Sequence, residues 1–255
     1  MMHEGVGPGI VVGRQRAKLS IVIPVFNEVR TIRDVVERVR AVDLPSGVTK
    51  EVLIVDDGST DGTAALLHLW SSDPSIRVLT LSARHGKSEA VRVGVAVATG
   101  DIVVLQDADL EYDPSHLAQL LQPILEGRAS VVFGSRFRGR IRRMVPLIWL
   151  ANRWSSWTVN LLFGAQLTDV NTGYKMMRRD LLHSVQVRSH HFGYEAELTA
   201  KLLRRGHHIS EVPIQYTART RREGKKMNWR AALHMYLCFI WYRFAQDGSP
   251  QDTEK

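Results

Sequence analysis

The stretch LSIVIPVF, residues 19–26, decides the fold class. It is apolar almost throughout and has the length and composition of a buried strand. Directly after it, Asn27 is suited to cap a helix. Apolar side chains then recur at helical spacing, at Val29, Ile32, Val35, Val36 and Val39. A buried strand followed at once by an amphipathic helix is the repeating unit of an α/β protein.

The same alternation continues through the first half of the chain. Further strands are predicted at EVLIVDD (51–57), IRVLTLS (76–82), DIVVLQD (101–107) and SVVFGSR (130–136). Helices are predicted over residues 87–98 and 114–126. Near-continuous apolar strands separated by helices predict a mostly parallel sheet with helices on both faces. We expect a flexible N-terminus (1–17), one α/β domain (18–218), a basic loop with an amphipathic helix (219–245) and a polar tail (246–255).

The chain has 255 residues and a net charge of +8, and the positive charge is concentrated in two segments. These are RFRGRIRR (136–143) and RTRREGKKMNWR (219–230). Such clusters favour a specific anionic partner, which could be nucleic acid, a phosphorylated ligand or an anionic membrane surface. The single cysteine, Cys238, excludes a disulfide framework. We expect no signal peptide and no transmembrane segment, because no sustained apolar run is present.

A ladder of acids follows the fourth strand. In VVLQDADLEYDP (103–114), carboxylates stand at Asp107, Asp109, Glu111 and Asp113. Ligands of open α/β sheets bind beyond the carboxyl ends of the strands. Carboxylate oxygens there could hold Mg²⁺ or Mn²⁺, which bridge to substrate phosphates. The alternative is a solvated loop with a helix cap, which is the role we expect for Asp113 before Pro114.

Two other strand ends carry candidate ligands. Asp57 could accept hydrogen bonds from a nucleobase or ribose, and Gly58 would let the backbone approach. The turn ARHGK, residues 83–87, precedes a helix and suits phosphate contacts. The alternative is a helix cap at Asp61 and a solvated basic turn.

Taken in order, these motifs resemble glycosyltransferase family 2 with the GT-A fold, and within it the dolichol-phosphate (polyprenyl-phosphate) mannosyltransferase group. The resemblance covers roughly residues 18–230. It rests on IVIPVFNE, VDDGSTDGT, ARHGKSEAVRVG, DADLEYDP, GSRF, DVNTGYK, FGYEAELTAKLLRRG, EVPIQY and RTRREGKK. It implies a Rossmann-like, mostly parallel sheet and C-terminal amphipathic helices at a membrane interface.

The resemblance also implies a donor site. Mg²⁺ or Mn²⁺ would be held by Asp107, Asp109 and Glu111, where the family often has glutamine at the third position. The family often has tyrosine where this chain has Phe26. The residues implied for the nucleotide are Pro24, Phe26, Glu28, Val55, Asp57, Gly58, Arg84, Gly86, Lys87 and Asp107.

For the chemistry, the resemblance implies Asp109, Asp169 and Arg136 as the catalytic group. A basic loop closing over the diphosphate would use Arg219, Arg221, Lys225 and Lys226. The acceptor phosphate would bind Arg136, Arg138 and Arg153, although the family often has arginine and serine near Trp149 and Arg153. Glu195 could reach a sugar hydroxyl or complement a helix dipole.

The implied activity is inverting transfer of a hexose from a nucleotide sugar to a polyprenyl or dolichyl phosphate. Mannose from GDP-mannose is the first expectation; glucose from UDP-glucose and a saccharide acceptor are the alternatives. A nucleic-acid-binding module is disfavoured, because acids at the strand ends repel phosphates. We expect a peripheral enzyme at the cytoplasmic membrane face, held by its Trp-rich and C-terminal helices or by an anchoring partner protein. The alternative is that these helices simply close the core.

Overall fold

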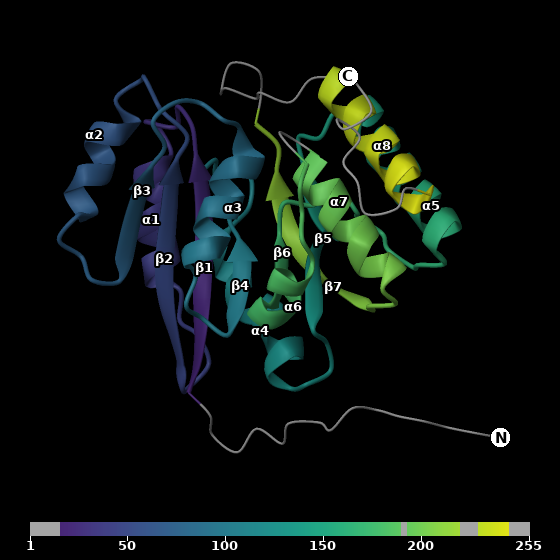
Figure 1. Ribbon diagram of the computed structural model, residues 1–255, viewed down its shortest axis with the longest axis horizontal. Coiled ribbons are helices and arrows are strands. Elements are labelled where there is room, and N and C mark those ends of the chain that lie inside the picture. Colours follow the sequence, from purple (N-terminus) through teal and green to yellow (C-terminus); the bar gives the residue numbers. More distant parts are fainter. Residues whose placement is uncertain (1–15, 190–192, 220–228, 245–255) are drawn as a thin grey trace.

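A seven-stranded sheet in the order β3-β2-β1-β4-β6-β5-β7 forms the centre of the molecule (Figure 1). The computed structural model describes residues 16–189, 193–219 and 229–244. The strands are β1 (Ala17–Val25), β2 (Val48–Asp56), β3 (Ile76–Thr80), β4 (Ile102–Leu105), β5 (Val131–Arg142), β6 (Lys175–Arg178) and β7 (Ile209–Thr217). The helices are α1 (Ile32–Ala41), α2 (Thr63–Leu67), η1 (His68–Trp70), α3 (Lys87–Val97), η2 (Pro114–His116), α4 (Leu117–Leu125), α5 (Pro146–Phe163), α6 (Arg179–Ser184), α7 (Gly193–Arg204) and α8 (Trp229–Phe244).

Strand direction decides where the functional loops meet. Every neighbouring pair is parallel except those made by β6, which runs antiparallel to both β4 and β5. The segment that precedes β6 therefore reaches the same edge as the segments that follow β4 and β5. The predicted mostly parallel sheet is confirmed, with β6 and β7 added to the five strands read from the sequence.

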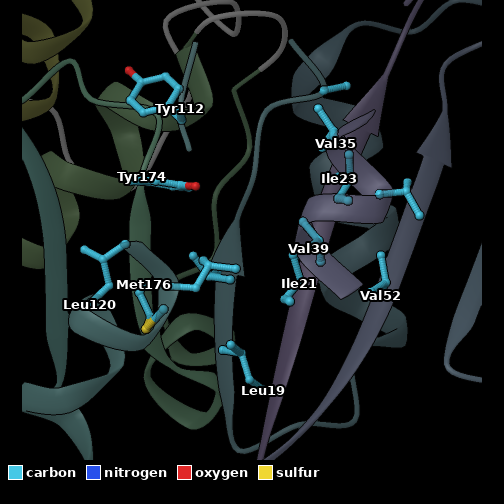
Figure 2. Close-up of a cluster of buried hydrophobic side chains, with 14 of the residues drawn as sticks. Leu19, Ile21, Ile23, Val35, Val39, Val52, Tyr112, Leu120, Tyr174 and Met176 are labelled. Atoms are coloured by element: carbon cyan, nitrogen blue, oxygen red, sulfur yellow. The ribbon is translucent and has the colours of Figure 1, made fainter. Parts of the chain in front are cut away.

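Helices cover both faces of the sheet, as predicted. Alternate residues of β1 divide between two hydrophobic clusters: Ile21 and Ile23 pack with Val35 of α1, whereas Val22 packs with α3. Figure 2 shows the first cluster continuing toward Tyr112, Tyr174 and Leu120 of α4. The two-residue period of a strand thus supplies one apolar layer to each face.

The last helix, α8, packs beside α5 (Figure 1). Cys238, Phe239 and Tyr242 are buried, so α8 closes the core on its inner side, as the alternative interpretation expected. By contrast, α5 leaves large apolar side chains exposed, among them Leu147, Leu150, Trp154, Trp157 and Leu161. Within the described ranges, no helix combines the length and the apolar character needed to cross a membrane.

Candidate active site

A cavity of about 410 Å³ opens at the carboxyl edge of the sheet. Its wall is formed by the end of β1, residues of β5 and β7, the loops after β2, β3 and β4, the segment before β6, and parts of α3, α5 and α7. Thirteen of the residues proposed from the sequence line it, namely Pro24, Phe26, Glu28, Asp57, Arg84, Gly86, Lys87, Asp107, Asp109, Glu111, Arg136, Glu195 and Arg219. The strand ends and the family resemblance together thus pointed to residues that line one cavity.

The acid ladder lies on a loop and not on a continued strand, because β4 ends at Leu105. Leu110 has a φ of 53°, which turns the chain between Asp109 and Glu111. Burial and the charges of Asp107 and Glu111 together raise the pKa of Asp109 to about 7, against the opposing effect of Arg219. The three carboxylates thus repel one another in a partly buried wall.

The carboxylates of these three acids are chemically suited to bind a hard divalent cation. Their oxygens are the ligands that Mg²⁺ and Mn²⁺ prefer. A β-carbon at Gly173 would lie 2.5 Å from Asp107 Oδ2, so glycine at that position leaves this oxygen accessible. Among the described residues, no group of three or more acids, histidines or cysteines is already arranged as a metal site. The assignment of Asp107, Asp109 and Glu111 to a metal therefore stays a prediction.

Two basic side chains hold the acids. Lys87 Nζ lies 2.7 Å from Asp107 Oδ1 and 2.7 Å from Glu195 Oε1. Burial lowers the pKa of Lys87, but the two carboxylates outweigh it and raise the pKa well above its ordinary value. Arg219 Nη2 lies 2.7 Å from Asp109 Oδ2, and its Nη1 lies 2.9 Å from Glu28 Oε2. The other loop residues proposed from the sequence, Arg221, Lys225 and Lys226, lie outside the described residues.

On the nucleotide side, Asp57 organises the turn beside it. Its carboxylate accepts hydrogen bonds from the backbone N–H groups of His85 (2.7 Å) and Gly86 (2.8 Å). This contact positions the Arg84 guanidinium 4.4 Å from the centre of the Phe26 ring. The guanidinium therefore lies over the face of the ring in a cation–π contact, and both residues line the cavity.

Two residues assigned to the nucleotide do not line the cavity. Val55 is fully buried in β2, where its side chain faces Gly94 of α3. Gly58 has a φ of +72°, and a β-carbon there would lie 3.0 Å from the carbonyl carbon of Ala83. Strand alternation directs the Val55 side chain away from the cavity, and the turn places Gly58 against Ala83. Both residues support the end of β2 without lining the cavity.

Arg136 is a buried cation in the wall of the same cavity. It is only 5% exposed and pairs with the fully buried Asp169. Its Nε lies 2.7 Å from Asp169 Oδ2 and its Nη2 lies 2.7 Å from Oδ1, a two-point ion pair. Asp169 is outside the cavity wall, so this geometry makes it a residue that holds Arg136.

The other two arginines assigned to the acceptor point elsewhere. Arg138 donates a hydrogen bond to the carbonyl of Glu211, and Arg153 donates one to the carbonyl of Thr168. Neither lines the cavity. The Arg138 guanidinium is held by a backbone oxygen of β7, and that of Arg153 by a backbone oxygen of the segment before β6. Their role at the acceptor phosphate stays a prediction.

Sequence reasoning missed Asn152, Asn171, Tyr112 and Tyr216, which also line the cavity. Asn152 Oδ1 accepts a hydrogen bond from Asn171, while Asn171 Oδ1 is buried and finds no hydrogen-bond partner in the described part of the chain. The Tyr216 hydroxyl donates to Glu111 at 2.6 Å. Asn171 and Tyr112 lie inside motifs already noted, DVNTGYK and DADLEYDP, which was the available signal.

The sequence of this chain is similar to those of known glycosyltransferases. The model for glycosyl transferase family 2 matches residues 20–186. The chain is 31% identical to an undecaprenyl-phosphate mannosyltransferase of Micrococcus luteus, over 82% of this chain and 87% of that one. It is 30% identical to a polyprenol monophosphomannose synthase of Mycolicibacterium smegmatis, over 85% and 84%.

A solved structure shares the fold. Glucosyl-3-phosphoglycerate synthase from Mycobacterium tuberculosis, in complex with Mn²⁺, uridine diphosphate and glucosyl-3-phosphoglycerate, superimposes with a TM-score of 0.69. The sequence identity is 22%, and the match covers 94% of this chain and 85% of that one. At this identity the likeness establishes the GT-A fold, which the sequence predicted.

Proposed function

The chain belongs to glycosyltransferase family 2, and from that premise we propose that it moves a hexose from a nucleotide sugar to a polyprenyl phosphate. One observation carries the proposal: a single cavity combines an acid wall at Asp107, Asp109 and Glu111 with a buried arginine, Arg136. The acid wall suits a cation with a diphosphate. The arginine suits a phosphate monoester.

On the donor side, the Gly86 N–H donates to Asp57, and this bond holds the turn that brings Gly86 to the cavity wall. Phe26 with Arg84 supports the base or ribose. When bound to Asp107, Asp109 and Glu111, Mg²⁺ or Mn²⁺ would supply positive charge to the leaving diphosphate.

On the acceptor side, Arg136 binds the phosphate with the edge of its guanidinium that Asp169 leaves open. A phosphate is already ionised at neutral pH, so it needs orientation more than deprotonation. A direct displacement inverts the anomeric carbon, and the buried Arg136–Asp169 pair supplies the rigid anchor for it.

The helix α5 connects the cavity to an exposed apolar surface. Ile148 and Asn152 line the cavity, while Leu147 and Leu150, on the same turns, are exposed at 75% and 58%. We infer that the lipid chain follows α5 into a membrane surface. Exposed arginines at the end of β5 would face anionic headgroups there. Sedimentation with anionic vesicles is expected to be strong at low salt and weaker at high salt, and absence of vesicle binding at low salt would contradict this placement.

For the donor, we propose mannose from GDP-mannose. Both relatives described above carry mannose in their names, which favours this sugar. The neighbouring structure contains uridine diphosphate, which keeps UDP-glucose as the alternative.

The testing experiment is a transfer assay with polyprenyl phosphate and Mn²⁺ or Mg²⁺, with GDP-mannose and UDP-glucose offered separately. Metal-dependent glycolipid from one donor, lost in Asp109→Ala, is expected. The matched control is Asp113→Ala, because Asp113 lies on the same loop, caps η2 and does not line the cavity. Hydrolysis of the donor without formation of glycolipid would contradict the proposal that the acceptor is a polyprenyl phosphate.

A further inference from the structure

The two central acids of the predicted metal site are already neutralised by cations of this same chain. Lys87 pairs with Asp107 and Arg219 pairs with Asp109, each at 2.7 Å. The side chains of Lys87 and Arg219 are 29% and 14% exposed, so these pairs are partly shielded from water. The acid wall is therefore occupied by internal positive charge.

Arg219 is held from several directions. Its guanidinium also reaches Glu28 at 2.9 and 3.3 Å, and its backbone N–H donates to Glu111 Oε1 at 2.7 Å. Its Nε is buried and has no hydrogen-bond partner among the residues that the structure describes. A guanidinium can use all five of its N–H groups, so this position of the side chain leaves the buried Nε donor unsatisfied.

Arg219 and a metal ion compete for the same oxygen. A divalent ion of the Mg²⁺ type needs a lone pair of Asp109 pointed at it. The Oδ2 atom of Asp109 accepts a charged N–H from Arg219 instead. A guanidinium cannot lose its charge, and two cations repel strongly in a shielded site. Metal can therefore bind Asp109 fully only after Arg219 has left it.

A diphosphate removes this conflict. It brings anionic oxygens into the same cavity, and arginine binds phosphate oxygens with two N–H groups at once. We propose that Arg219 is an internal counter-ion that holds the acid wall until a nucleoside diphosphate arrives and then transfers to its phosphates. Metal and nucleotide consequently bind cooperatively, and each raises the affinity for the other by the same factor. This inference rests on the proposed function, because it takes a diphosphate as the ligand.

The test measures Mn²⁺ affinity of the full chain from the electron paramagnetic resonance signal of free Mn²⁺, without substrate turnover. GDP and UDP serve as probes. In the wild type, saturating nucleotide is expected to tighten Mn²⁺ binding about tenfold or more. In Arg219→Gln, Mn²⁺ alone is expected to bind about tenfold more tightly than in the wild type, and the nucleotide effect shrinks.

Two further variants separate charge from folding. Arg219→Lys keeps the positive charge, so its Mn²⁺ affinity without nucleotide stays nearer the wild-type value. Arg178→Gln is the matched control, because Arg178 pairs with Asp180 at 2.9 Å, is exposed and does not line the cavity. Its Mn²⁺ affinity stays at the wild-type value.

Equal or weaker Mn²⁺ binding by Arg219→Gln, with nucleotide-supported binding retained, overturns the role of Arg219 and leaves the metal site intact. Absence of Mn²⁺ binding by every variant under every condition overturns the metal site itself, and with it the proposed function.

Discussion

Replacing Asp169 by asparagine tests whether this residue holds Arg136 or acts as a base. Asp169 is fully buried and accepts three hydrogen bonds from Arg136: from the backbone N–H at 3.0 Å, from Nε at 2.7 Å and from Nη2 at 2.7 Å. The amide keeps one accepting oxygen but turns an N–H toward the guanidinium and removes the opposing charge. Leaving one partner of a buried pair unmatched costs about 3–5 kcal/mol. We take about 3 kcal/mol, because part of the hydrogen bonding survives.

Urea unfolding followed by tryptophan fluorescence measures this loss. With a slope of about 2–3 kcal/mol/M for a chain of this size, the midpoint is expected to fall by about 1–1.5 M. Asp180→Asn is the matched control, since Asp180 forms an exposed pair with Arg178 and such pairs contribute about 0–1 kcal/mol. In the transfer assay, the acceptor KM of Asp169→Asn is expected to rise, because Arg136 loses its fixed orientation.

A double variant completes the experiment. In Arg136→Met with Asp169→Asn no buried charge is left unpaired, so its midpoint should lie above that of Asp169→Asn alone. An Asp169→Asn midpoint within about 0.3 M of the wild type, together with a lost kcat, would refute the reasoning. That result would identify Asp169 as a base and favour a hydroxyl acceptor.

Three further predictions concern stability and reactivity. Hydrogen bonds from Lys18 and other groups outweigh burial and hold the pKa of Glu51 at about 2, below its ordinary 4.5. Glu51 therefore stabilises the fold above about pH 4.5 by about 1–2 kcal/mol after solvent screening, a contribution lost as pH falls toward 2, and urea midpoints measured between pH 5 and 2.5 should be less pH-dependent in Glu51→Gln. A β-carbon at Gly94 would lie 2.5 Å from Val22 Cγ1, so Gly94→Ala should lower stability by about 1–3 kcal/mol in thermal melts. Cys238 is buried, and burial raises its pKa to about 11, so a disulfide reagent at pH 8 should label it only at the rate of opening or unfolding.

Each of these has a clear opposing result. Equal pH dependence in Glu51→Gln and wild type would mean that the carboxylate is not stabilised in the folded state. An unchanged melting temperature in Gly94→Ala would mean that α3 can move away from β1 at no cost. Labelling of native Cys238 as fast as that of the urea-unfolded chain would contradict its burial.

The sequence predicts the strand ends well, because a buried parallel strand is an apolar run and acidic residues follow the point where several of these runs end. It does not predict β6, whose four residues include the buried Lys175. That lysine is stabilised by contacts invisible in the sequence: its Nζ donates to the Val170 carbonyl and lies 4.0 Å from the centre of the Phe133 ring. Burial lowers its pKa to about 8.

Side-chain direction limits the prediction of the site. Val55 belongs to the correct strand end but alternates to the wrong face, and Arg138 is bound by a backbone carbonyl. The pairings of Lys87 and Arg219 with acids join residues far apart in the chain. Long flexible side chains choose among several partners in space, and no local pattern encodes that choice.

The antiparallel strand β6 also has a consequence for how the chain assembles. Residues 17–105 contain β3, β2, β1 and β4 as one contiguous half of the sheet, whereas β5 and β7 form the other edge. The four residues of β6 join the two halves, and they come about 70 positions after β4 in the chain. Glu28, Asp57 and the acids of the loop directly after β4 come from the first half, whereas Arg136, Gly173, Glu195 and Arg219 come from the second. No fragment confined to one half contains the cavity, so the site is a product of long-range closure and is complete only when this short strand is in place.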